Sequence, residues 1–103
     1  MVKKIDAVQY ATETKEGVCI VDFSATWCGP CQMLAPVLEE LSVDLDGKAK
    51  FFKLDIDENA ALASEKGIAS VPSLMVLKDG KEVDLLVGFR PKQMLMDALE
   101  KYL

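Results

Sequence analysis

The chain has 103 residues, half of them apolar, which predicts one packed globular domain over residues 1–103 and excludes a disordered chain. Seventeen acidic and twelve basic residues give a net charge of −5, which argues against nucleic acid as a partner. The apolar runs are too short to span a membrane, and the N-terminal segment lacks the apolar stretch of a secretory signal.

The first half of the chain predicts two helices with one buried strand between them. A helical pattern covers residues 7–15, and residues 18–23 form a nearly continuous apolar run, typical of a strand covered on both faces. The segment that follows carries an apolar stripe with helical spacing, made of Leu34, Leu38, Leu41 and Leu45. We expect Gly47 to cap the end of this helix.

The second half predicts three more strands. Residues 50–56 and 73–77 are again apolar runs of the strand type. Residues 81–87 alternate apolar and charged side chains, which is typical of a half-exposed strand near a sheet edge. Asp79 and Gly80 form a strong two-residue hairpin signal, so we expect the last two strands to be antiparallel.

Two further helices complete the pattern. A short helix is expected over residues 60–65, capped by Asp57 and ended by Gly67. Pro91 suits the first turn of a last helix, whose inner face would carry Leu95, Leu99 and Tyr102. Strands that alternate with helices, followed by a terminal hairpin and helix, predict an α/β fold with a mixed sheet and helices on both faces.

Cys28 and Cys31 lie where the first predicted strand gives way to the long helix, and their spacing allows three kinds of site. A structural zinc site needs four thiolate or imidazole ligands, but the chain has no histidine and only one further cysteine, Cys19. A disulfide staple across so short a loop would restrict the unfolded chain little. Both sites remain as alternatives to a redox pair.

A redox pair fits the surroundings best. Free N–H groups and the helix dipole at a helix start favour a thiolate at Cys28, which we expect to be exposed. Cys31 lies one turn further along and inward, where it can resolve a mixed disulfide. Gly29 would allow a partner backbone to approach closely, and Pro30 would stiffen the first turn. An odd number of cysteines without an export signal argues for a reducing compartment, the cytoplasm.

Three other residues allow two interpretations each. Asp22 interrupts an apolar strand and is either a solvated acid at the strand end or a buried proton acceptor for Cys31. Without histidine, a carboxylate is the leading candidate for that work, and burial would raise its pKa. Trp27 either shields the pair or packs on the surface. Cys19 is either a small buried side chain or a regulatory thiol.

Together these motifs resemble the thioredoxin family. The resemblance is carried by "WCGPC" after "VDFSAT", Pro36 in the helix, "KLDID", "VPS" and "VGF", and it extends from about Val2 to Leu103. It implies the thioredoxin fold, an α/β architecture with a central mixed sheet of about five strands flanked by four helices. It also implies a dithiol electron carrier that reduces protein disulfides, needs no cofactor beyond the redox-active disulfide Cys28–Cys31, and is recharged by a thioredoxin reductase.

The resemblance also implies roles for individual residues. Cys28 matches the attacking cysteine, Cys31 the resolving one, and Pro72 the family's cis-proline. The backbone of Val71 would pair with the substrate chain like an added strand. A shallow groove beside the sulfurs would be formed by Gly29, Pro30, Val71 and Gly88.

Lys53 would offset the charge of Asp22 from the neighbouring strand, as the family match suggests. A groove with few side-chain demands suits diverse disulfide-containing protein partners, and we expect the carrier to be a monomer. One departure is Ser24, which stands where many members carry a large aromatic residue.

Two other functions remain open at this stage. An oxidase or isomerase of the same fold would usually carry histidine between the cysteines, where this chain has Gly29 and Pro30. A binding module could use the same fold for a scaffolding role in which the thiols are incidental. Measuring the reduction of protein disulfides would distinguish the electron carrier from these alternative functions.

Overall fold

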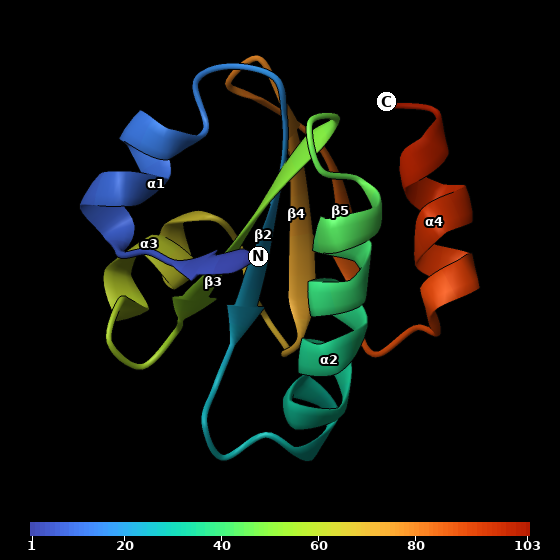
Figure 1. Cartoon of the computed structure of the whole chain (residues 1–103). Helices are drawn as coiled ribbons and strands as arrows, with labels where there is room; N and C mark the ends of the chain where they lie inside the picture. Colours follow the sequence, from blue (N-terminus) through green and yellow to red (C-terminus); the bar gives the residue numbers. More distant parts are fainter.

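A five-stranded mixed sheet forms the centre of the molecule in the computed structural model, which describes residues 1–103 (Figure 1). The elements in chain order are β1 (Val2–Lys4), α1 (Ala7–Glu13), β2 (Val18–Ser24), α2 (Gly29–Asp44), β3 (Ala49–Asp55), α3 (Ala60–Glu65), β4 (Ser73–Lys78), β5 (Lys81–Val87) and α4 (Lys92–Glu100). The strand order is β1-β3-β2-β4-β5. β1, β3 and β2 run parallel to one another, and β4 is antiparallel to both β2 and β5.

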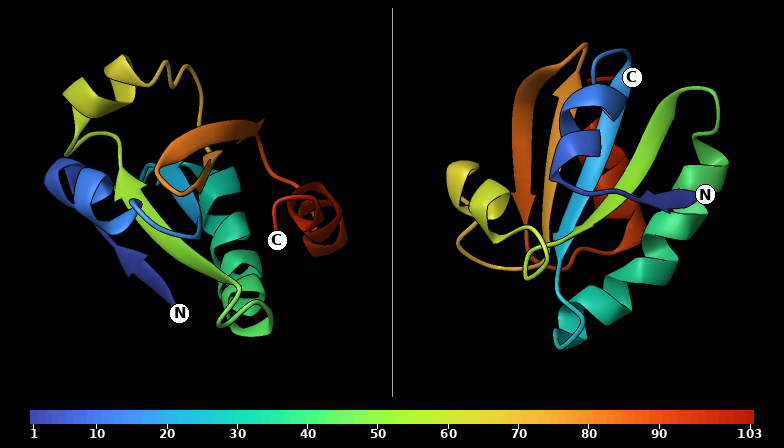
Figure 2. Two further views of the ribbon diagram at one scale, coloured as in Figure 1. Left: turned by 90° about the horizontal axis from the view of Figure 1, so that it is seen from above. Right: turned by 90° about the vertical axis from the view of Figure 1, so that its left-hand side faces the viewer.

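The helices form one layer on each face of the sheet. Figure 2 shows α2 and α4 on one side and α1 and α3 on the other. This arrangement confirms the expected mixed sheet with helices on both faces. It places the start of α2 at the carboxyl end of β2, so the loop between them brings the two cysteines to the end of the central strand.

One strand was absent from the expected pattern. β1 has three residues, two of them lysines, and no apolar alternation marks it. It becomes a strand through pairing, because Val2 lies opposite Phe51 and Lys4 opposite Lys53 in a parallel ladder with β3. So short a strand is defined by its neighbour and not by its own sequence.

The predicted hairpin is confirmed, whereas the predicted cap of α3 is wrong. Asp79 and Gly80 both have positive φ, at 51° and 82°, as a type I′ turn requires. Asn59, not Asp57, occupies the N-cap of α3, and it makes no capping hydrogen bond with its side chain. Gly67 does follow the helix end with φ 70°, the conformation expected of a residue that ends a helix.

The ends of α2 and α4 differ by a few residues from expectation. α2 ends at Asp44 with Leu45 as its C-cap, so Gly47 belongs to the turn that follows and does not cap the helix. Pro91 occupies the N-cap of α4 rather than its first turn, and its carbonyl accepts the N–H of Leu95 at 3.1 Å. Both differences lie within the usual uncertainty of helix boundaries.

β5 is a half-exposed edge strand, as its alternation predicted, but its ladder is irregular. The register with β4 shifts after Val76, so Val83 has no partner on the neighbouring strand. Leu86 is the buried residue of β5, while Val83 and Val87 remain exposed. The carboxylate of Asp84 accepts the N–H of Leu85 at 2.8 Å.

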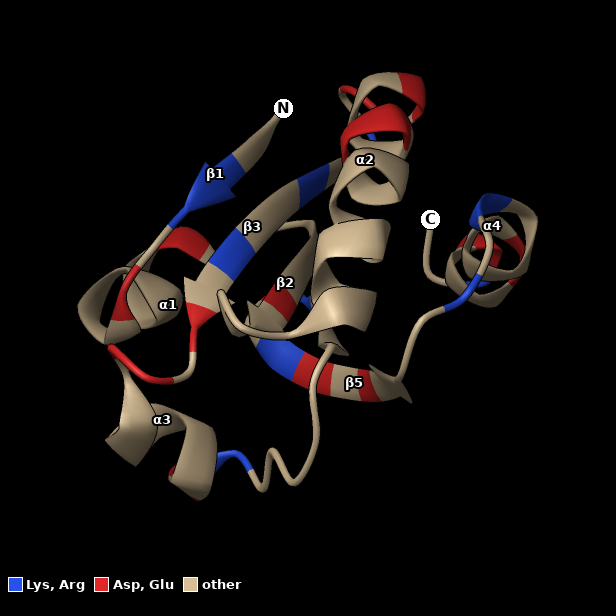
Figure 3. Ribbon diagram, turned by 90° about the horizontal axis from the view of Figure 1, so that it is seen from below, with Lys and Arg blue, Asp and Glu red and all other residues tan.

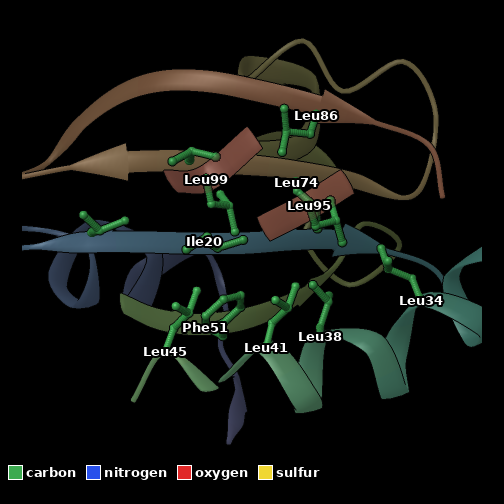
Figure 4. Packing of buried hydrophobic residues seen from close by; sticks show 12 residues of the cluster. Ile20, Leu34, Leu38, Leu41, Leu45, Phe51, Leu74, Leu86, Leu95 and Leu99 are labelled. Carbon is green, nitrogen blue, oxygen red and sulfur yellow. The ribbon is translucent and has the colours of Figure 1, made fainter. Parts of the chain in front are cut away.

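The two faces of the sheet bury separate apolar clusters. The larger lies under α2 and α4 and contains the predicted leucine stripe, together with Ile20, Leu95 and Leu99 (Figure 4). The smaller lies under α1 and α3 and includes Cys19 and Phe23. β2 contributes to both clusters, since all of its residues are buried.

Replacing Leu41 by alanine tests the predicted stripe. Leu41 is fully buried, so Leu41→Ala is expected to lower the free energy of unfolding by about 2–5 kcal/mol. Val43→Ala, two residues along the same helix, is the control because Val43 is 66% exposed. It should change the free energy by less than about 0.5 kcal/mol. Urea denaturation of both reduced variants measures the difference, and equal losses would contradict this assignment of the buried face.

Candidate active site

The cysteine pair lies at the start of α2. Cys28 is the N-cap of the helix, and its Sγ accepts the N–H of Cys31 at 3.2 Å. The Cys28 thiol also lies 3.8 Å from the carbonyl oxygen of Val71, to which it can donate. A sulfur that accepts a backbone N–H at a helix start is in an environment that stabilises negative charge.

Cys28 is more enclosed than the sequence suggested, whereas Cys31 is buried as expected. Cys28 was expected to be exposed, but it retains only 5% of its surface, and Cys31 retains 2%. With Ala25 they form a small apolar cluster, against which Ile56 and Val71 pack. A partner sulfur must therefore come close to the protein surface to reach Cys28.

The two cysteines have different environments. Burial, followed by a hydrogen bond with Cys28, raises the pKa of Cys31 to about 12. All three cysteines of the chain are free thiols in this structure. Cys31 is therefore protonated near neutral pH and needs a proton acceptor before it can act as a nucleophile.

Asp22 is a buried acid without a hydrogen-bond partner on Oδ1. It lies on β2 and is 1% exposed. Burial raises its pKa to about 7, and the positive charge of Lys53 opposes this rise. Lys53 lies directly opposite Asp22 in the ladder between β2 and β3. The alternative of a solvated acid at the strand end is therefore wrong, because the carboxyl group lies in the interior.

Trp27 stands beside the pair on the surface and is 68% exposed. Its indole N–H donates to Oδ2 of Asp57 at 2.8 Å. The ring borders an apolar depression of about 270 Å³ together with residues 68–71 and Ile56. The sequence analysis did not predict this hydrogen bond, because nothing in the local pattern around Asp57 indicates a partner 30 residues away.

The remaining predicted groove residues lie around the same sulfurs. The peptide bond between Val71 and Pro72 is cis, as the resemblance implied. The N–H of Gly88 donates to the Pro72 carbonyl at 2.8 Å, which joins the end of β5 to the start of β4. Gly29 and Pro30 are exposed at the start of α2. The structure thus brings three segments of the chain, at residues 29–30, 71–72 and 88, to the same end of the sheet.

Cys19 lies elsewhere. It is fully buried in the cluster under α1 and α3, and its thiol lies 3.6 Å from the carbonyl of Glu16. Burial raises its pKa, which disfavours the reactive thiolate. This environment supports the interpretation of a small buried side chain.

No group of three or more potential ligands from His, Cys, Asp and Glu is placed to hold a metal ion. None of the helices combines the length and apolarity needed to cross a bilayer.

Comparison with known proteins agrees with this geometry. A family model described as Thioredoxin matches residues 2–101. The thioredoxins of Staphylococcus aureus strains MW2 and COL are each 50% identical over 100 residues, covering 97% of this chain and 96% of theirs. A solved mutant thioredoxin from Halobacterium salinarum NRC-1 is 39% identical, with a TM-score of 0.89, and the match covers 97% of this chain and 88% of that one.

The family model covers nearly the whole chain, and the relatives match it over almost their full length. The five-stranded sheet with its four helices is shared with the solved relative. This chain therefore belongs to the thioredoxin family and is a protein-disulfide oxidoreductase.

Proposed function

We propose that this chain is a single-domain, monomeric dithiol carrier of the cytoplasm that reduces diverse disulfide-containing proteins and is itself re-reduced by a thioredoxin reductase. The observation that carries the proposal is the unequal pair of sulfurs. Cys28 accepts a backbone N–H at a helix start, whereas Cys31 is held protonated beneath it. One sulfur is thus prepared for attack and the other for the second step.

The reaction requires two sulfur exchanges. The Cys28 thiolate attacks one sulfur of the partner disulfide, forms a mixed disulfide and displaces the other partner sulfur as a thiolate. Cys31 then loses its proton and attacks the Sγ of Cys28. The mixed disulfide breaks, the second partner sulfur leaves, and the Cys28–Cys31 disulfide forms. Two electrons pass to the partner, which is released as a dithiol after taking up protons.

Asp22 is the proposed proton acceptor for Cys31. Its buried carboxyl acts on Cys31 electrostatically, since its negative charge contributes to the raised pKa of that thiol. A pKa of about 7 suits a group that must take up and release a proton near neutral pH. Lys53, opposite Asp22, keeps this pKa from rising further. Both residues would act on the second exchange, after the mixed disulfide has formed.

The partner chain is proposed to bind along residues 71–72. The Val71 carbonyl faces the Cys28 thiol, so a partner strand that pairs with this backbone would bring its own sulfur near Cys28. Gly29, Pro30 and Gly88 border the groove and present little side-chain bulk. Trp27 borders the neighbouring apolar depression, which offers a place for an apolar side chain of the partner. Contacts of this kind discriminate little between partner sequences, which fits a carrier with many partners.

Insulin disulfide reduction with a catalytic supply of dithiol tests the function. Cys28→Ser is expected to abolish activity, and Cys31→Ser to accumulate a mixed disulfide that mass spectrometry detects. Cys19→Ser is the matched control and should retain activity, since Cys19 lies in a separate cluster. Retention of partner by a Cys28→Ser, Cys31→Ser double variant, with no reduction by the wild type, would show a binding module instead.

Replacing Asp22 by asparagine is expected to stabilise the fold. The folded pKa of about 7 lies above the unfolded value, so the ionised form costs stability as pH rises from about 4 through 7. Asp22→Asn should therefore raise the free energy of unfolding by about 2–4 kcal/mol at pH 8 and by little at pH 4. Denaturant titrations across this range measure the gain. Exposed Asp46→Asn is the control, and a loss of stability in Asp22→Asn at pH 8 would contradict the burial argument.

The same substitution is expected to slow the second exchange. Without a carboxylate to accept the Cys31 proton, release of reduced partner should fall by about tenfold or more, while formation of the mixed disulfide stays near the wild-type rate. Rapid-quench kinetics separates the two steps. Equal slowing of both steps, or normal release, would remove Asp22 from the proposed mechanism.

A further inference from the structure

A cavity of about 220 Å³ lies beside Asp22, between the sheet and α2. Asp22 and Lys53 line it from the sheet, Pro36 and Glu39 line it from α2, and Val2 lines it from β1. Asp22 Oδ1 has no hydrogen-bond partner, so an unpaired buried carboxyl borders this space. The access of water to the cavity therefore affects the free energy of the ionised carboxylate.

The cavity extends along a row of residues that crosses three strands. Lys4 on β1 lies opposite Lys53 on β3, which lies opposite Asp22 on β2. Figure 3 shows basic residues on β1 and β3 and an acidic residue on β2. Because β1 is the edge strand, the row leads from the outside of the sheet to the buried carboxyl group. Any opening at β1 would shorten the path from bulk water to Asp22.

One hydrogen bond joins β1 to a side chain of α2, in addition to the packing of Val2 against the cluster under α2. The N–H of Val2 donates to Oε1 of Glu39 at 3.1 Å. Val2 and Glu39 both border the cavity, so this hydrogen bond joins two of its lining residues, one of them on the edge strand. β1 is three residues long and pairs only with β3, so contacts beyond the ladder help to hold it. Its other side-chain contacts include the exposed ion pairs of Lys3 with Glu13 and Lys4 with Glu58, neither of which reaches α2.

We propose that Glu39 is a positioning residue, which holds β1 against α2 through the Val2 N–H and so closes the outer side of the Asp22 cavity to bulk water. The proposal rests on the proposed function, in which Asp22 accepts the proton of Cys31. Glu39 itself touches neither sulfur. Its effect on the reaction passes through the hydration of Asp22, which sets how readily that carboxyl group gains or loses a proton.

The charged and titratable groups around Asp22 come from three elements. Lys53 faces it from β3, Cys31 and Glu39 lie on α2, and Lys4 lies at the far end of the row on β1. From β4, the residue opposite Asp22 is apolar Leu74. Removing Glu39 changes both a charge and a hydrogen bond, and the experiment has to separate these two effects.

Four variants make this separation. Glu39→Ala removes charge and acceptor, whereas Glu39→Gln removes the charge and keeps an acceptor for Val2. Val2→Pro removes the donor and keeps the charge of Glu39, at a first strand position where proline is tolerated. Glu40→Gln removes a neighbouring charge outside the cavity and is the matched control. The titration of Asp22 in the reduced proteins is followed by carbon NMR of labelled aspartate.

Opening the cavity should hydrate the carboxylate and lower the Asp22 pKa. We expect a fall of about 0.5–1 unit in Glu39→Ala and Val2→Pro, a smaller one in Glu39→Gln and little change in Glu40→Gln. Amide hydrogen exchange at Ile5, whose N–H donates to the Lys53 carbonyl at 2.9 Å, should accelerate in Glu39→Ala and Val2→Pro. The pH midpoint of partner release should shift together with the titration.

Two results would overturn the proposal. Equal shifts in Glu39→Ala and Glu39→Gln with none in Val2→Pro would show that only the charge of Glu39 matters. An unchanged titration in all the variants would show that the hydrogen bond does not control hydration. A shifted titration with an unchanged pH dependence of release would instead support the closing role of Glu39 and remove Asp22 from proton transfer, so the two claims fail separately.

Discussion

The burial of the Asp22 carboxyl group beneath the cysteine pair is the constraint on which the site depends. A carboxylate in the interior with an unpaired oxygen is unfavourable, and the protein does not remove this cost with a close ion pair or a hydrogen bond on Oδ1. Lys53 lowers the cost through its charge alone. The carboxyl group consequently changes its protonation state near neutral pH, where an ordinary aspartate would be fully ionised.

The sheet and α2 fix the positions of the groups in the proposed proton transfer. β2 carries Asp22 inside the protein and leads directly to Cys28, and the first turn of α2 buries Cys31. The three groups are therefore fixed by one strand, one loop and one helix start. The leucine stripe of α2 keeps the helix on the sheet, so the packing of the core and the chemistry of the pair share the same helix.

Much of this arrangement follows from local sequence patterns. The stripe from Leu34 to Leu45 and the turn at Asp79 and Gly80 are signals contained within a few residues, and both were predicted. Other features join segments that are distant in the chain, and no short sequence pattern contains them. These are the pairing of β1 with β3 and the hydrogen bonds of Trp27 with Asp57 and of Val2 with Glu39. The enclosure of Cys28 was missed for the same reason, because Ile56 and Val71 reach it only in the folded chain.

The irregular edge at β5 has a consequence for the behaviour of the protein at high concentration. A flat, regular edge strand offers its free N–H and C=O groups to other copies and invites fibril formation. Here the unpaired Val83 interrupts the ladder, and the Asp84 carboxylate occupies the N–H of Leu85. A bulge followed by a self-capped amide is a poor template for another copy. Exposed valines can then remain on β5 without making that edge a site of self-assembly.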